Sequence, residues 1–204
     1  MVVWRHQTCG CYFPRIVIDR RVRPRATRFL EPIGKALAAI GITPTVMTSL
    51  GLAVVIAGAV VIGLGWLRTG ATIVFLGALL DGLDGAVARA SGSVTSRGAF
   101  LDSAFDRIGE IAAFAGLAVW FADDKRVLLL TVLAVGGAML VPYIRARAEI
   151  EGFDGKGGLM GRAERVFLFS LGLWTGYVEI MLWAFVVLVW LTAVVRFFKT
   201  YRSL

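Results

Sequence analysis

Long apolar stretches dominate this sequence and limit the folds that it can adopt. Residues 46–66, 70–91, 96–121, 126–149, 161–177 and 179–200 are predominantly apolar, and most reach the roughly 20 residues that a helix needs to cross about 30 Å of hydrocarbon. The chain is 58% hydrophobic, against roughly 45–50% in soluble domains. The sequence therefore predicts an all-α integral membrane protein, a bundle of six transmembrane helices in which residues 1–204 form one domain.

Positive charge lies mainly on one side of this layout. Six crossings put both termini on the same face of the membrane. Nearly all of the 22 Lys and Arg residues lie on that face, if Arg107, just inside the third predicted helix, is assigned to it. The exceptions are Arg68, Lys125 and Arg126. Because cytoplasmic segments of membrane proteins are enriched in Lys and Arg, we expect both termini on the cytoplasmic face of a cell membrane. We expect membrane lipids, and no nucleic acid, among the partners.

The N-terminal segment mixes cations with spaced apolar residues. Residues 15–40 predict a basic amphipathic helix that lies on the anionic membrane surface, broken or kinked by prolines. Nearer the terminus, His6, Cys9 and Cys11 fall short of the closed four-ligand set of a structural metal site. We interpret them as part of a solvated tail.

Four aspartates interrupt the apolar pattern. Asp81 and Asp84 are three residues apart on one predicted helix, and Asp102 and Asp106 are four apart on the next, so each pair projects from one helical face. A charge at mid-bilayer costs on the order of 2.5–3.5 kcal/mol, so four clustered carboxylates require nearby cations. An antiparallel hairpin would bring both pairs together near the cytoplasmic end. Such a cluster suits two hard divalent cations.

Glycines beside the first pair favour a ligand over a purely structural cluster. Gly82 and Gly85 remove side chains there, which would let a phosphate-bearing ligand approach the backbone. In the alternative interpretation, ion pairs neutralise the acids; the arginines in reach are Arg89, Arg97 and Arg107. That interpretation does not explain the glycines. A divalent-cation transporter would also place acids among helices, but its site usually lies near the midplane on broken helices.

The same stretch resembles the signature of the CDP-alcohol phosphotransferase family. That signature is an Asp, two residues, Asp-Gly, two residues, Ala-Arg, eight residues, Gly, three residues, Asp, three residues and Asp. All eight fixed positions match, and they are Asp81, Asp84, Gly85, Ala88, Arg89, Gly98, Asp102 and Asp106. The resemblance implies an enzyme in which an alcohol attacks the β-phosphate of a CDP-linked lipid and releases CMP. It also suggests a homodimer.

The resemblance further implies roles for individual residues. Two ions, Mg²⁺ or Mn²⁺, would be held by two overlapping sets, Asp81, Asp84 and Asp102 for one ion and Asp81, Asp102 and Asp106 for the other. Asp106 would also serve as the general base. The residues implied to bind the CDP-lipid are Thr45, Val46, Met47, Thr48, Gly85, Arg89 and Thr95. A helix-capping turn is the alternative interpretation of the segment 43–48.

A second stretch bears on the acceptor alcohol. The segments "YIRARAE" and "RAER" within 143–166 resemble the phosphatidylinositol-phosphate synthase branch, which has a proline where this chain has Ala163. The branch implies that Arg145, Arg165 and Arg196 bind the phosphate of inositol 1-phosphate; ordinary loop charge is the alternative. We expect the donor to be CDP-diacylglycerol or an archaeal-type CDP-lipid. Phosphatidylglycerol-phosphate synthesis from glycerol 3-phosphate is the nearest alternative activity.

Overall fold

All regular structure is helical in the residues that a computed structural model describes, which are 32–92, 95–153, 155 and 158–204. The helices are α2 (Pro44–Gly63), α3 (Leu67–Asp81), α4 (Asp84–Ala90), α5 (Ser96–Trp120), α6 (Lys125–Ile150), α7 (Arg162–Thr175) and α8 (Val178–Ser203), and residues 32–39 are helical as well. The all-α prediction is thus confirmed over these ranges. Most of the predicted helix 15–40 lies outside the described residues, as do His6, Cys9 and Cys11.

Four candidate spans are long and apolar enough to cross a membrane. They are Pro44–Gly63, Leu67–Ala90, Lys125–Ile150 and Val178–Ser203. The other two predicted crossings do not meet this criterion, for different reasons. Helix α5 has 25 residues but carries five charged side chains, all before residue 111, whereas α7 has 14 residues. At 1.5 Å per residue α7 is about 21 Å long, which is short of a hydrocarbon layer of about 30 Å.

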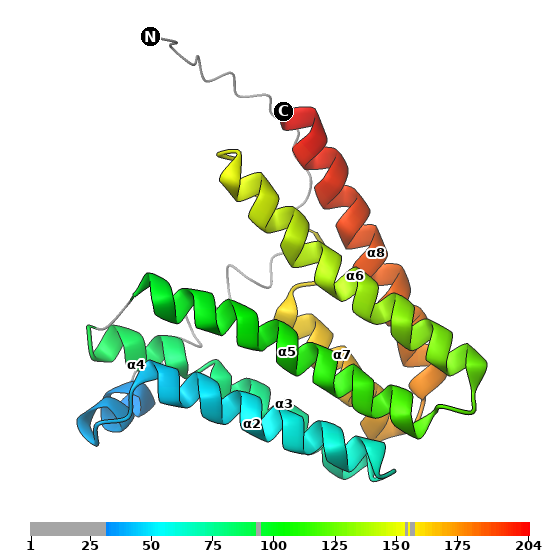
Figure 1. The fold of residues 1–204 in the computed structure, drawn as a ribbon, viewed down its shortest axis with the longest axis horizontal. Helices are drawn as coiled ribbons and strands as arrows, with labels where there is room; N and C mark the ends of the chain where they lie inside the picture. The colour runs from blue at the N-terminus through cyan, green and yellow to red at the C-terminus, as the bar shows by residue number, and fades with distance from the viewer. Residues whose placement is uncertain (1–31, 93–94, 154, 156–157) are drawn as a thin grey trace.

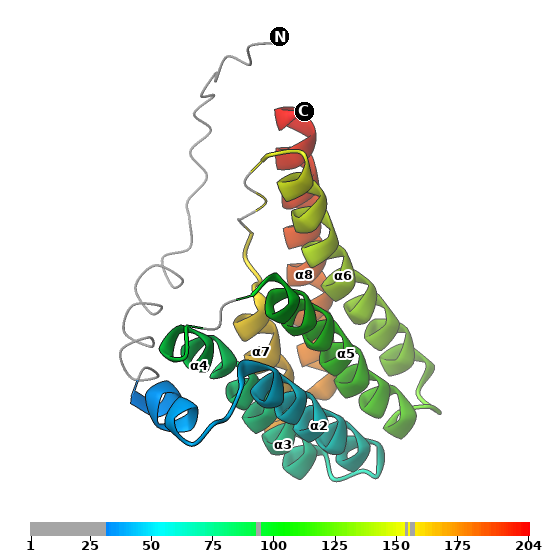
Figure 2. The ribbon, with the colours of Figure 1, turned by 60° about the vertical axis from the view of Figure 1, so that its left-hand side comes forward.

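The helices form two groups joined by α7. Helix α2 packs between α3 and α5, while α6 packs along α8, and α7 contacts both α3 and α8 (Figure 1). The turns 64–66, 121–124 and 176–177 gather at one end of the bundle. At the other end α6 and α8 extend together beyond the remaining helices (Figure 2). The start of α5 and the short helix α4 lie beside one another at this second end.

Glycines bring the backbones of α2 and α3 into direct contact. A Cβ on Gly51 would lie 3.1 Å from the Gly77 carbonyl oxygen, and one on Gly58 would lie 3.0 Å from the Gly70 carbonyl oxygen. Small residues permit this close approach between membrane helices. The contact also fixes the acidic end of α3, because Gly51 packs against the Cβ of Asp81, the last residue of that helix.

A third backbone contact, between α5 and α2, gives a test of the fold. A Cβ on Gly116 would lie 2.9 Å from the Ala59 carbonyl carbon, an atom that a side-chain rotation cannot move. Gly116→Ala should therefore destabilise the protein by about 1–3 kcal/mol, although Gly→Ala in a helix otherwise stabilises by up to about 1 kcal/mol. Thermal unfolding in detergent measures the difference. Gly136→Ala is the matched control, since its Cβ would be 4.0 Å from Trp190, and equal melting temperatures for the two variants would contradict this packing.

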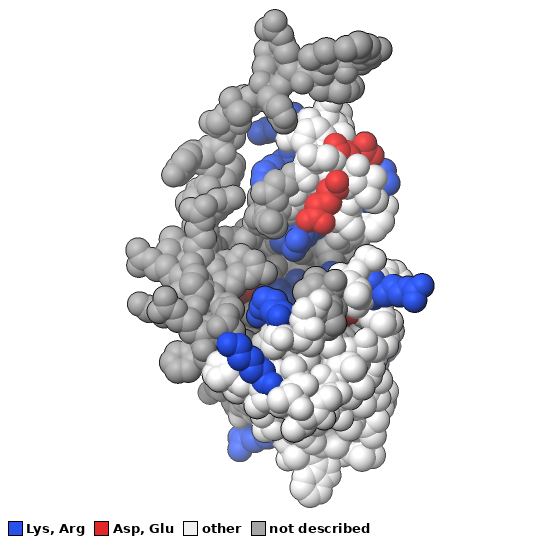
Figure 3. Space-filling model, turned by 90° about the vertical axis from the view of Figure 1, so that its left-hand side faces the viewer, with Lys and Arg blue, Asp and Glu red and all other residues white. Residues whose placement is uncertain are grey.

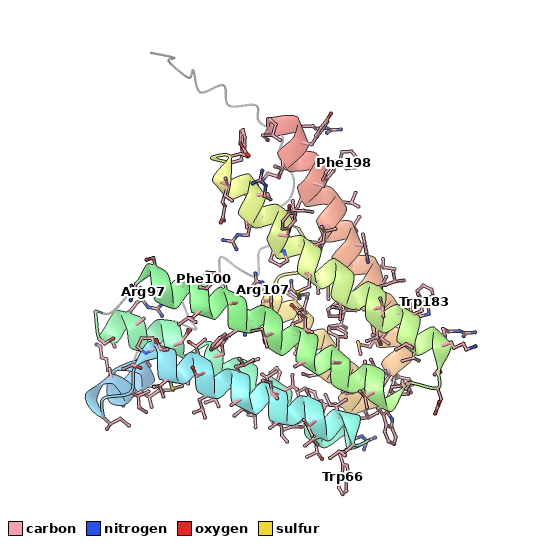
Figure 4. The ribbon with its side chains drawn as sticks, in the orientation of Figure 1. Trp66, Arg97, Phe100, Arg107, Trp183 and Phe198 are labelled. Atoms are coloured by element: carbon pink, nitrogen blue, oxygen red, sulfur yellow. The ribbon has the colours of Figure 1, made fainter. Side chains whose placement is uncertain are left out.

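Aromatic residues link the two groups of helices and face the lipid. Phe114 of α5 packs edge to face against Phe169 of α7 and Phe185 of α8, at centroid distances of 4.9 and 5.0 Å. On the outside, Trp66 and Trp183 project from the end where the turns gather (Figure 4). Exposed tryptophans near helix ends are typical of proteins at the membrane–water interface.

Candidate active site

The four aspartates come from three helix ends that meet at the end of the bundle opposite the turns. Asp81 ends α3, Asp84 begins α4, and Asp102 and Asp106 lie one turn apart on α5. Carboxylate oxygens of Asp81, Asp102 and Asp106 lie within 4.8 Å of one another. Asp81 is buried and the other two are partly buried. The structure therefore brings together acids from both predicted pairs.

Asp84 lies beside this trio of Asp81, Asp102 and Asp106, because the predicted helix 70–91 is interrupted at Gly82 and Leu83. Its Oδ2 accepts a hydrogen bond of 2.9 Å from the Thr48 hydroxyl, which joins the start of α2 to α4. It is also close enough to Asp81 and Asp102 for their carboxylates to repel one another. All four acids thus share one electrostatic environment.

An arginine that the sequence did not single out faces the trio. Arg162, in the first turn of α7, places Nη2 2.6 Å from Asp81 Oδ2 and Nη1 2.7 Å from Asp106 Oδ1. Both oxygens are buried, and neither has a hydrogen bond of good geometry despite the short separation. Arg162 therefore supplies positive charge to the cluster without fully satisfying its oxygens.

The arginines expected in the ion-pair interpretation account for only part of this charge. Among the described side chains, only Arg107 of those three pairs with one of the four acids, at 3.2 Å from Asp106 Oδ2. Figure 4 shows Arg107 on the side of α5 that faces away from α2. The Arg89 side chain instead lies over Gly85, where a Cβ would be 3.3 Å from Arg89 Nη1. Asp102 makes no ion pair with a described residue.

The other predicted CDP-lipid contacts occupy the starts of two helices. Thr43 caps α2 by accepting a hydrogen bond from the Val46 amide, so the capping interpretation fits that residue. Thr45 and Val46 are exposed in the same turn, whereas Met47 is buried. Thr95 caps α5 by accepting from the amide of Gly98, the motif glycine, at 3.1 Å. These residues border the end of the bundle where the acids lie.

The three predicted acceptor arginines come from three different helices and lie near one another. The charges of Arg145 on α6 and Arg165 on α7 both act on Arg196 on α8. Arg145 has an exposed side-chain partner, and Arg196 has a backbone partner. Arg145 Nε donates to Glu149 at 2.8 Å, and Arg196 Nη1 donates to the Val141 carbonyl at 3.1 Å.

The partner of Arg165 is buried and was missed by the sequence analysis. Arg165 Nε donates to Glu110 Oε1 at 2.6 Å and Nη2 donates to Glu110 Oε2 at 3.1 Å. Glu110 lies one turn beyond Asp106, so Asp102, Asp106 and Glu110 share one face of α5. That spacing of four residues was the only available signal for Glu110. For Arg162 the corresponding signal was its position three residues before Arg165 at the start of a helix.

A small cavity connects these groups. It has a volume of about 50 Å³ and lies between α2, α3, α5 and α7. Its charged lining consists of Asp81, Asp106, Glu110, Arg162 and Arg165, and most of the remaining lining is apolar. Figure 3 shows that Lys and Arg side chains border a recess on this end of the molecule. The end that holds the acids therefore presents a basic rim.

The trio of acids fits a hard divalent cation. Oxygens that bind one ion at roughly 2.0–2.6 Å lie up to about 4–5 Å apart, and the three carboxylates meet this limit. Buried oxygens without good hydrogen bonds, such as Asp81 Oδ2 and Asp106 Oδ1, are rare and costly unless a cation satisfies them. Carboxylates without thiolate or imidazole partners suit magnesium or manganese rather than softer metals.

Comparison with known proteins agrees with this chemistry. The profile of the family described as CDP-alcohol phosphatidyltransferase matches residues 41–198. The chain is 37% identical over 178 residues to the phosphatidylinositol phosphate synthase of Mycobacterium marinum, covering 84% of this chain and 76% of that protein. It is 33% identical over 185 residues to the archaetidylinositol phosphate synthase of Pyrococcus horikoshii, covering 90% and 97%.

Two solved structures share the fold. Both are of phosphatidylinositol phosphate synthase from Mycobacterium tuberculosis, each with a TM-score of 0.79 and 34% sequence identity. One was determined with CDP-DAG bound, and the match covers 85% of this chain and 94% of that one. The other is a complex with manganese and citrate, with coverage of 84% and 88%.

Proposed function

Because the chain belongs to the CDP-alcohol phosphatidyltransferase family, we propose that it transfers a phosphatidyl group from CDP-diacylglycerol to inositol 1-phosphate, giving phosphatidylinositol phosphate and CMP. The convergence of Asp81, Asp102 and Asp106 carries this proposal, because it assembles the acids of the family signature at one point. The related archaetidylinositol phosphate synthase supports an archaeal-type CDP-lipid as a second possible donor.

The acids would hold two divalent ions, Mg²⁺ or Mn²⁺. Asp81, Asp84 and Asp102 form one ligand set and Asp81, Asp102 and Asp106 the other. When bound, the ions offset the negative charge on the diphosphate and on the departing CMP. A solved relative with manganese supports the choice of metal. The Thr48 hydroxyl orients the Asp84 carboxylate through its 2.9 Å hydrogen bond.

Asp106 is the proposed general base. Its carboxylate takes the proton of the attacking hydroxyl group of the acceptor. The hydroxyl oxygen forms a bond to the lipid-side phosphorus, the bond from that phosphorus to the CMP oxygen breaks, and CMP leaves with the bonding electrons. Contacts from Arg107 and Arg162 hold the Asp106 carboxylate in place on both of its oxygens.

The CDP moiety would bind across the starts of α2, α4 and α5. The proposed contacts are Thr45, Val46, Met47, Thr48, Gly85, Arg89 and Thr95. Arg89 is exposed and its guanidinium lies over Gly85, so it can offer two parallel N–H donors to a phosphate. The absence of a side chain at Gly85 leaves room for this arrangement. The acceptor phosphate would bind to Arg145, Arg165 and Arg196, whose charges lie close together.

The membrane arrangement completes the proposal. Residues 1–204 form one domain with six crossings, in which α5 and α7 join the four candidate spans, and residues 15–40 form an amphipathic helix on the membrane surface. The active site and both termini face the cytoplasm of the cell, and the protein forms a homodimer. The basic rim around the acids supports this orientation, because Lys and Arg favour the cytoplasmic side.

A panel of acceptors tests the proposed activity. The purified protein, given CDP-diacylglycerol and Mn²⁺ or Mg²⁺, should release CMP with inositol 1-phosphate at least about tenfold faster than with free inositol, because free inositol lacks the phosphate and loss of one charged hydrogen bond costs about 1.5–3 kcal/mol. The rate should also exceed that with glycerol 3-phosphate, which keeps the phosphate but lacks the inositol ring. CMP release is measured directly by chromatography. A preference for glycerol 3-phosphate would reject the inositol assignment and leave the family chemistry intact.

A further inference from the structure

Glu110 is a partly buried acid with no role in the transfer chemistry described above. Its side chain is 13% exposed, that of Arg165 is 6% exposed, and the two make two hydrogen bonds to each other. Isolated buried charges are costly, so each residue requires the other in this position. The pair also joins α5 to α7.

Among the described residues, the hydrogen bonds that the structure gives the Arg165 guanidinium go to Glu110 and use one of its edges. Glu110 occupies the edge formed by Nε and Nη2, with separations of 2.6 and 3.1 Å. A guanidinium has five N–H donors, and a second edge, formed by Nη1 and Nη2, can make another bidentate contact with a phosphate. Arg165 lines the same cavity as Asp81, Asp106 and Arg162, so an anion that Arg165 binds from this cavity would lie beside the acidic cluster.

Glu110 pairs with one of three neighbouring arginines, Arg165. Arg145 and Arg165 both repel Arg196, so three guanidinium groups share a small region. Glu149 balances Arg145 from an exposed position, where water weakens the interaction. The Glu110 side chain is less exposed than that of Glu149, so its contact with Arg165 is the less screened of the two.

We propose that Glu110 is a positioning residue for the phosphorylated acceptor: it holds Arg165 in the orientation that presents its second edge to the acceptor phosphate. The inference rests on the proposed function, in which Arg165 binds that phosphate. Glu110 itself touches neither substrate. Its effect therefore reaches the acceptor through Arg165 and leaves the CDP-lipid unaffected.

Steady-state kinetics of Glu110→Gln test this proposal. The variant keeps the shape of the side chain and removes its charge. The KM for inositol 1-phosphate should rise about 10- to 100-fold, as expected for loss of a charged hydrogen-bond partner, while the KM for CDP-diacylglycerol changes less than about twofold. Glu110→Asp, which restores the charge, should recover part of the acceptor affinity. The affinity for inositol 1-phosphate, measured by calorimetry, should be highest in the wild type, lower in Glu110→Asp and lowest in Glu110→Gln.

A second experiment, in a protein that already carries Arg165→Ala, separates a positioning role of Glu110 from a role in folding. Arg165→Ala should raise the acceptor KM on its own, and adding Glu110→Gln to it should change that KM by less than about twofold, because the two residues act through one contact. The double variant also removes both buried charges, so it should fold even if Arg165→Ala does not. Glu151→Gln is the control, since Glu151 forms an exposed pair with Arg147 at 3.2 Å and should leave all constants unchanged.

Two results would overturn the inference. One is an equal rise in the donor and acceptor KM of Glu110→Gln, which would make Glu110 a structural residue only. The other is additivity of the Glu110 and Arg165 substitutions. Failure of the proposed function has a different signature: the wild-type protein would not use inositol 1-phosphate, and the same variants would then be measured with the phosphorylated acceptor that it does use.

Discussion

Asp106→Asn is expected to lower the rate of CMP release by at least about 10³-fold, because general-base catalysis alone contributes roughly 10²–10⁴. The substitution also removes one charged ligand from the Asp81, Asp102 and Asp106 trio, whose oxygens lie within 4.8 Å. Both losses act on the same chemical step. The rate is measured with CDP-diacylglycerol, inositol 1-phosphate and saturating Mn²⁺.

The same variant should remain folded. Arg162 keeps its 2.6 Å contact with Asp81 when the charge of Asp106 is removed, so its guanidinium is not left buried and unpaired. Elution of a single species from a sizing column and a melting temperature near that of the wild type would establish this. Asp123→Asn, an exposed aspartate in a turn at the opposite end, is the matched control and should be fully active. Retention of more than a tenth of the activity by Asp106→Asn would exclude Asp106 as the base.

Removal of divalent metal is expected to have an effect of similar size. A bound divalent ion contributes several kcal/mol to stabilising transition-state charge, and each 1.36 kcal/mol is tenfold in rate, so chelation should reduce CMP release by at least about 10³-fold. Dialysis against EDTA followed by addition of Mn²⁺ or Mg²⁺ should restore the rate, whereas the same ionic strength of NaCl should not.

Metal content gives a readout that does not depend on turnover. The proposal expects about two Mn²⁺ ions per chain at saturation, measured by elemental analysis of protein separated from free metal, and fewer in the Asp81→Asn variant, since Asp81 belongs to both ligand sets. Full activity in protein shown to be free of metal would disprove a metal-dependent transfer. A single ion per wild-type chain would correct the ligand assignment and leave the chemistry standing.

The sequence was sufficient for features that depend on local spacing. Asp102 and Asp106 are one turn apart in any helix. The connection between Ala90 and Ser96 is short, so a helical hairpin is the simplest arrangement for the two acidic pairs. Helix positions also followed from apolar length. The exceptions are the interruption at Gly82 and Leu83, the charged residues of the site that lower the hydropathy of α5, and the short length of α7, which has 14 residues.

Contacts between distant helices were beyond the sequence analysis. Arg165 was predicted to bind the acceptor phosphate and Arg162 was given no role, because nothing local shows that the start of α7 packs against the acidic face of α5. The same holds for Glu110, whose partner is 55 residues away. Local spacing therefore predicted the acids, while their counter-charges required the tertiary structure.

The backbone contact between α2 and α3 has a consequence for how a substrate with two hydrocarbon tails reaches the acids. Gly51, Gly58, Gly70 and Gly77 pack directly against the backbone and side chains of the opposite helix, so these helices cannot separate without losing the whole contact. Helix α7, in contrast, meets the acids through arginine side chains that can exchange one anion for another. We therefore expect any widening of the site for the lipid or the product to occur on the α7 side, with the contact between α2 and α3 unchanged.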